Sequence, residues 1–270
     1  SGPILVTRWE GVDIAFLSRH GPGHLLNPSV VPYRANIYAM KMLGVTHILA
    51  SGATGSLREE IRPRDLVICD QVIDKTSRRD ATFFDEGIVV HVEFAEPFCP
   101  KLRSLLIEAG KQIKATVHPR GTYVCMEGPQ FSTVAESQMH KAWGGDPIGM
   151  TCMPEARLAR EAEMSYALIA LPTDYDCWRP HEPGKDRQVL LAEIIDNLKA
   201  VTANGIELLR VVVPMLARRL DEDWPYQDAL AMAIWSDKSE VDPALVERLA
   251  PLLKRYFPTS NHLSCGSRPS

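Results

Sequence analysis

Short apolar segments alternate with segments of helical period along this chain, and the alternation limits its fold more than any other feature. The short runs predict buried strands at 46–50, 66–72, 121–125 and 166–171. Helical spacing of apolar residues predicts helices at 33–43, 100–109, 134–143, 154–163 and, with an interruption at Gly205, 188–220. Strands that alternate with helices predict an α/β fold around a mainly parallel sheet.

The composition disfavours several classes of protein. Thirty Lys and Arg residues against 34 Asp and Glu give a net charge of −4, which argues against a nucleic-acid partner. No apolar run reaches the ~18 residues of a membrane span, so we predict no membrane contact. The six cysteines form neither a CxxC pair nor a zinc-ligand spacing. We therefore predict no metal site, reduced thiols and a cytoplasmic location.

The loops that follow the predicted strands are the first place to look for a site, because α/β folds bind ligands beyond the carboxyl ends of their strands. Arg19 and His20 follow a predicted hairpin and offer donors suited to a phosphate, although a solvated surface pair has the same residues. Residues 51–56 are small and polar, which is typical of a backbone cradle for an anion. A tight turn between strand and helix is the alternative for that loop.

Two carboxylates, Asp174 and Asp176, follow the predicted strand at 166–171 and stand beside Tyr and Trp. A carboxyl group in such surroundings can serve as a general acid, whereas helix capping is the ordinary structural use of Asp. Phe131 lies in a loop that begins Glu-Gly-Pro, where its ring can stack on a flat heterocycle or belong to the core.

Seven short motifs occur in a fixed order along most of the chain. They are Arg19-His20-Gly21 with His24, PYRAN at 32–36, GSLREE at 55–60, AEPF at 95–98, EGP at 127–129, Met150-Thr151 and TDYDCW at 173–178. Together they resemble the trimeric purine nucleoside phosphorylases, and within that family the branch that acts on 5′-methylthioadenosine. The resemblance covers residues 1–216 and implies a central mixed, mostly parallel sheet flanked by helices.

The resemblance also implies a reaction. Inorganic phosphate, as co-substrate, would attack C1′ of the ribose while the bond to N9 breaks, through an oxocarbenium-like transition state. The products would be adenine and 5-methylthioribose 1-phosphate. No cofactor is expected, and the implied partners are the nucleoside, the phosphate and further copies of the chain in a homotrimer.

The same resemblance assigns roles to individual residues. Phosphate contacts are expected from Arg19, His20, Gly52, Ala53 and Thr151. Substrate contacts are expected from Met150 at the ribose, Phe131 on the base, and His24 and His91. The segment around His91 would reach across a subunit boundary to close the 5′-methylthio pocket.

Asp174 and Asp176 are the catalytic pair that the resemblance implies. Asp174 would donate a proton to N7 of the leaving purine, and Asp176 would accept a hydrogen bond from its 6-amino group. An acidic pair therefore favours 6-amino purines over 6-oxo purines.

Some positions depart from the family pattern and keep alternatives open. The family's first strand and its glycine-rich phosphate loop are missing from this sequence, which leaves an inactive nucleoside-binding scaffold as one alternative. Gly52 replaces a hydroxyl residue, and Gly149 replaces an Asn. Gly149 favours a methylthioinosine phosphorylase or a broad purine nucleoside phosphorylase, whereas Asp174 and Asp176 oppose it.

We divide the chain into a catalytic domain at 1–222, a C-terminal helical extension at 223–257 and a disordered Ser- and Pro-rich tail at 258–270. A long excursion at 77–96 contains Phe83, Phe84 and other large apolar residues. Such a loop is too apolar to lie free in water, which predicts assembly beyond a monomer.

Overall fold

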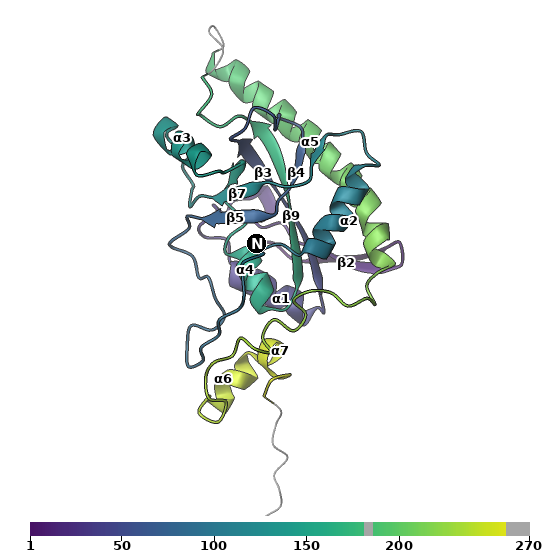
Figure 1. The fold of residues 1–270 in the computed structure, drawn as a ribbon, viewed down its shortest axis with the longest axis vertical. Helices are drawn as coiled ribbons and strands as arrows, with labels where there is room; N and C mark the ends of the chain where they lie inside the picture. The colour runs from purple at the N-terminus through teal and green to yellow at the C-terminus, as the bar shows by residue number, and fades with distance from the viewer. Residues whose placement is uncertain (181–185, 258–270) are drawn as a thin grey trace, which may run out of the picture.

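The computed structural model of the protein describes residues 1–180 and 186–257. At its centre lies a seven-stranded sheet in the order β5-β7-β8-β3-β9-β4-β6 (Figure 1). Its strands are β3 (His47–Ser56), β4 (Leu66–Ile68), β5 (Gln71–Asp74), β6 (Val117–His118), β7 (Thr122–Cys125), β8 (Pro147–Gly149) and β9 (Ser165–Asp174). A separate hairpin contains β1 (Leu5–Trp9) and β2 (Val12–Phe16). The predicted tail at 258–270 lies outside the described residues.

The sheet is mixed and mostly parallel, which confirms the predicted fold class. The pairs β3–β9, β4–β6, β5–β7 and β7–β8 are parallel, whereas β3–β8 and β4–β9 are antiparallel. The long central strand β9 is buried from Ser165 to Thr173 because helices cover both of its faces.

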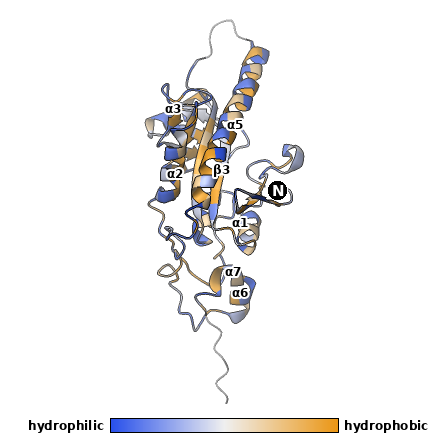
Figure 2. Cartoon of the chain, turned by 90° about the vertical axis from the view of Figure 1, so that its right-hand side faces the viewer, coloured by the Kyte–Doolittle hydropathy of each residue, from blue (hydrophilic) through white to orange (hydrophobic). Residues whose placement is uncertain are grey.

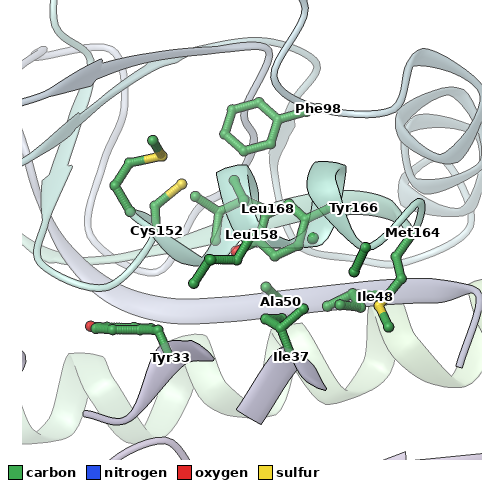
Figure 3. Packing of buried hydrophobic residues seen from close by; sticks show 14 of the residues in the cluster. Tyr33, Ile37, Ile48, Ala50, Phe98, Cys152, Leu158, Met164, Tyr166 and Leu168 are labelled. Atoms are coloured by element: carbon green, nitrogen blue, oxygen red, sulfur yellow. The ribbon is translucent and has the colours of Figure 1, made fainter. Parts of the chain in front are cut away.

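The helices are α1 (Tyr33–Met42), α2 (Pro100–Gly110), α3 (Val134–Ala142), α4 (Glu155–Glu161), α5 (Arg187–Ala217), α6 (Pro243–Arg248) and α7 (Ala250–Leu253), with a 3-10 turn at Pro22–His24. Side chains of β9 alternate between two cores. Tyr166 and Leu168 pack with Ile37 of α1 and Leu158 of α4 (Figure 3). Ile169 packs on the other face with α2 and α5.

The C-terminal segment, residues 223–257, folds back onto the rest of the chain. Leu230, Leu245 and Leu253 share a core cluster with Phe83 and Phe84 of the excursion. Val90 of the excursion also forms an isolated antiparallel bridge with Ile234. Phe83, Phe84 and Ile88 are therefore buried within one chain and only Val89 among the excursion's large apolar residues is exposed, so the excursion no longer supports the predicted assembly.

Two predicted elements differ in the structure. The predicted strand 66–72 is wrong, because the chain breaks at Cys69-Asp70 and sends β4 and β5 to opposite sides of the sheet. The predicted loop 51–56 is also wrong, because these residues continue β3 to Ser56. Their small side chains suit a strand with close neighbours on both sides, a feature that local composition cannot distinguish from a turn.

The long helix α5 is not interrupted at Gly205, contrary to the prediction. Gly205 lies in the helix interior, where its lack of a side chain allows close packing on Leu171. By length and composition alone α5 could cross a membrane, although Val201, Leu208 and Val212 are fully buried in the core. Its first half extends beyond the sheet and exposes Leu191 and other apolar residues (Figure 2).

Candidate active site

Strand β3 brings the predicted site residues into one line. It pairs with β9 along most of its length but with β8 only at Gly55 and Ser56. A Cβ atom added at Gly52 would lie 3.4 Å from Oγ1 of Thr151, and one added at Gly55 would lie 3.3 Å from Oδ1 of Asp174. Three residues of a strand span about 10 Å, so Thr151 and Asp174 mark two ends of a nucleoside-sized stretch.

Arg19 lies at the Thr151 end of this line. Its Nε and Nη2 donate to the two carboxylate oxygens of Glu155 at 2.5 and 2.8 Å, and its Nη1 donates to the carbonyl of Ser51 at 2.9 Å. Burial alone would lower the pKa of Arg19, but the charge and hydrogen bonds of Glu155 raise it above its usual value. The guanidinium is therefore a fixed positive charge one residue away from Gly52.

His20 lies next to Arg19 and is stacked on His24, with ring centroids 4.1 Å apart. Its Nδ1 is 2.7 Å from the carbonyl oxygen of Leu26, which can only accept, so we assign the proton to Nδ1. Burial lowers the pKa of His20, opposed by that hydrogen bond. In the neutral ring Nε2 is then an acceptor, suited to a phosphate that still carries a proton.

Asp174 and Asp176 lie at the other end of β3, and the structure brings them together. The backbone N–H of Asp176 donates to Oδ1 of Asp174 at 2.8 Å, and the Thr173 hydroxyl donates to Oδ2 of Asp174 at 2.7 Å. A Cβ atom at Gly55 would lie 3.1 Å from the Asp176 Cβ, so the close approach of Asp176 requires a residue without a side chain at position 55. The Asp176 backbone adopts a left-handed φ of 47°.

Phe131 and Met150 come from two loops that meet beside this line. The ring of Phe131 is 84% exposed, so it is not a core residue and remains available to a ligand. The loop that carries it is tied to the acidic segment, because the Cys177 thiol donates to the carbonyl of Ser132 at 3.2 Å. Met150 covers Gly128, where a Cβ atom would lie 2.5 Å from Sδ and where φ is 70°.

The residue that joins these loops was not among the predicted site residues. Arg79, from the excursion, has a side chain that is 1% exposed and donates to the carbonyls of Met150, Met153 and Glu127. It also pairs with the Glu127 carboxylate at 3.2 Å. Burial opposes ionisation of Glu127, but hydrogen bonds from Ser29 and the excursion backbone, with the Arg79 charge, lower its pKa to about 2.

His91 is not brought to the other predicted residues within one chain. It is exposed and lies edge-on to Trp235, with ring centroids 5.0 Å apart. Its backbone N–H donates to the carbonyl of Ala233 in the C-terminal segment. Figure 1 shows this part of the excursion near α6, at the opposite end of the molecule from α3.

A hollow of about 380 Å³ adjoins the Arg79 cluster. The residues around it are Ser29, Val30, Val31, Pro32, Tyr33, Arg34, Ala35, Arg78, Arg79 and Asp80. None of the predicted site residues lines this hollow. Among residues 1–180 and 186–257 no group of three His, Cys, Asp or Glu side chains is arranged to hold a metal ion.

The chain is similar to known proteins over most of its length. The model of the phosphorylase superfamily matches residues 1–213. A Synechocystis protein named S-methyl-5′-thioadenosine phosphorylase is 45% identical over 261 residues, 96% of this chain and 78% of its own. That match extends beyond residue 213, so relatives share much of the C-terminal segment.

Solved structures give the same result. A methylthioadenosine phosphorylase from an antarctic soil metagenomic library has a TM-score of 0.87 and 44% identity, covering 93% of this chain and 87% of its own. The methylthioadenosine phosphorylase of Schistosoma mansoni, solved with tubercidin, has a TM-score of 0.78 and 36% identity, covering 87% of this chain and 88% of its own. The resemblance inferred from the seven motifs is thereby confirmed.

Proposed function

The chain belongs to the phosphorylase superfamily, and we propose that it cleaves 5′-methylthioadenosine with inorganic phosphate, releasing adenine and 5-methylthioribose 1-phosphate. The observation that carries this proposal is the spacing along β3. A fixed cation and a hydroxyl, from Arg19 and Thr151, lie at one end, and the two carboxylates lie about 10 Å away. That separation suits a phosphate below the ribose and a purine at the acidic end.

The two ends of the site have different tasks in the reaction. At the Thr151 end, Arg19 and the backbone of Gly52 and Ala53 hold the phosphate, and Thr151 adds a hydroxyl. Because Glu155 already neutralises much of the Arg19 charge, the phosphate keeps its nucleophilic character. His20 accepts a hydrogen bond from a protonated phosphate oxygen.

At the acidic end, the purine leaves with its charge compensated. In this scheme Asp174 enters the reaction protonated, passes its proton to N7 as the bond to N9 breaks, and is left as a carboxylate; general acid catalysis of this kind contributes ~10²–10⁴-fold to the rate. Asp176 accepts from the 6-amino group. The exposed ring of Phe131 stacks on the base, and Met150 packs against the ribose.

We also propose that several copies of the chain assemble. The first half of α5 exposes an apolar face, formed by Leu191, Ile194, Ile195 and Leu198, which a neighbouring subunit would cover in a homotrimer.

 In its own chain His91 is exposed and contacts Trp235 and the backbone of Ala233 in the C-terminal segment. We therefore assign it to the 5′-methylthio pocket of a neighbouring subunit. No cofactor or metal is needed in this scheme, and we propose a cytoplasmic location, where the thiols stay reduced.

The test is the release of adenine from 5′-methylthioadenosine with phosphate present, omitted or replaced by arsenate. We expect release only with phosphate or arsenate, and no loss of rate with a chelator. Equal release without either anion would mean a hydrolase and would overturn the proposal. No release under any condition would favour the inactive scaffold.

One observation bears on the alternative substrate, methylthioinosine. Gly149, which favoured that alternative, lies against Tyr123, whose hydroxyl takes the space of a side chain at residue 149. Packing therefore explains Gly149 without reference to the base. Asp174 and Asp176 remain the residues that face the base, and they favour the 6-amino group.

A further inference from the structure

Helix α3 carries a serine that contacts the acidic end of the site from behind. Ser137 is fully buried, and its hydroxyl donates to Oδ2 of Asp176 at 2.5 Å. The helix start is fixed by a capping box between Thr133 and Glu136, so Ser137 comes from a well-anchored first turn.

A second contact ties the same helix face to the acidic segment. The ammonium of Lys141 lies 3.3 Å from the centroid of the Trp178 ring, and the indole N–H of Trp178 donates to the carbonyl of Ser56 at the end of β3. Ser137 and Lys141 are four residues apart, so they lie on one face of α3. The helix therefore holds the segment from Asp176 to Trp178 at two points.

The contact with Ser137 limits how the Asp176 carboxylate can turn. The last side-chain torsion of Asp has a broad, roughly two-fold preference, so a carboxylate without a fixed partner can rotate. Ser137 binds Oδ2, and the Asp176 backbone N–H is bound to Asp174. The orientation of the carboxylate is thus determined from both its backbone and its side chain.

We propose that Ser137 is a positioning residue that fixes the Asp176 carboxylate as an acceptor toward C6 of the purine, and so sets the preference for 6-amino over 6-oxo nucleosides. This inference rests on the proposed function. A fixed acceptor matches a 6-amino group and faces a 6-oxo oxygen with like charge, so it both attracts one substrate and rejects the other. A carboxylate that can turn away loses part of both effects.

The test compares kcat/KM for 5′-methylthioadenosine and 5′-methylthioinosine in four variants. In Ser137→Ala we expect the ratio of the two to fall about 10-fold or more, the effect of one hydrogen bond to a charged group. Ser137→Thr keeps the hydroxyl and should restore most of the ratio. Ser137→Cys, with a weaker donor, should give an intermediate ratio.

Ser165→Ala is the matched control. Ser165 is also fully buried, and its hydroxyl donates to the carbonyl of Pro225 at 3.1 Å. It is the first residue of β9, at the opposite end of that strand from Asp174, so its loss should leave the ratio unchanged.

Two results would overturn the inference: an unchanged ratio in Ser137→Ala, or an equal loss on both substrates without recovery in Ser137→Thr. A parent enzyme that does not cleave 5′-methylthioadenosine would instead contradict the proposed function. In that case calorimetric binding of adenine and hypoxanthine still tests Ser137, because base recognition needs no chemistry. Equal effects of Ser137→Ala on both bases would then contradict the inference.

Discussion

The hydroxyl of Tyr123 occupies the space beside Gly149. A Cβ atom added at Gly149 would overlap that oxygen and would lie 2.8 Å from Cζ of the same ring. Tyr123 is 2% exposed, and its hydroxyl also hydrogen-bonds the backbone of Thr151. A tyrosine on β7 and a glycine on β8, immediately before Met150 and Thr151 in the chain, are therefore matched in volume.

This match predicts strong coupling between the two positions. Gly149→Ala should lower the free energy of unfolding by about 1–3 kcal/mol, because an overpacked core must shift. In a Tyr123→Leu background the same change should cost much less, which gives a coupling of about 0.5–3 kcal/mol. Urea unfolding of the two single variants and the double variant measures it. Additive effects would show that the Tyr123 ring does not limit residue 149.

The Arg19–Glu155 pair predicts a combined loss of stability and phosphate use. Arg19→Ala leaves Glu155, which is 5% exposed, as an unpaired buried charge, and such a loss costs about 3–5 kcal/mol. The KM for phosphate should also rise about 10- to 150-fold, because a charge-assisted contact is removed.

Arg8→Ala provides the comparison for Arg19. Arg8 forms an exposed pair with Asp13 at 3.9 Å, and such pairs contribute little. We expect unchanged kinetics and little change in stability. If Arg19→Ala left the KM for phosphate unchanged, Arg19 would not belong to the phosphate end.

Glu161 predicts a pH dependence of stability. It accepts from the Thr82 hydroxyl at 2.7 Å and the Phe83 N–H at 2.8 Å, and burial, only partly offset by these bonds, raises its pKa from 4.5 to about 7. The folded state holds this proton more tightly than the unfolded chain. Stability from this group is therefore complete below pH 4.5 and is lost as the pH rises through about 7.

Glu161→Gln should remove this part of the pH dependence, at most about 3 kcal/mol between pH 4.5 and 7. Urea unfolding across this range, with the exposed Glu247→Gln as control, measures it. A variant that keeps the slope of the parent would show that another group titrates.

His140 predicts a stabilising substitution. Its ring is 2% exposed, and neither ring nitrogen has a hydrogen-bond partner among the described residues. Burial lowers its pKa, to which the charge of Lys75 adds. His140→Phe keeps the edge-on contact with Trp143 and removes two unsatisfied polar atoms, so we expect a gain of about 1–3 kcal/mol in urea unfolding. A loss of stability would mean that the imidazole nitrogens of the parent protein form hydrogen bonds in solution.

The sequence predicted those features of the fold that are local. The run at 166–171 identified β9, because a strand covered on both faces consists of continuous apolar residues. The small residues at 51–56 led to the wrong prediction of a loop. In the sequence, glycine in a strand with close neighbours cannot be distinguished from glycine in a turn.

The parts of the site that the sequence missed depend on contacts between distant segments. Arg79 meets Glu127 from 48 residues away, and Ser137 meets Asp176 from 39 residues away. Neither Arg79 nor Ser137 stands in a chemically distinctive motif. The predicted roles of Asp174, Thr151 and the other site residues stay predictions, although the structure shows how β3 aligns them.

The most direct test of the account is the identity of the sugar product. Phosphorus NMR of a reaction that contains the protein, 5′-methylthioadenosine and inorganic phosphate should show one sugar phosphate ester formed for each adenine released. This is the signal of 5-methylthioribose 1-phosphate. Adenine release with free 5-methylthioribose and unconsumed phosphate would contradict the account.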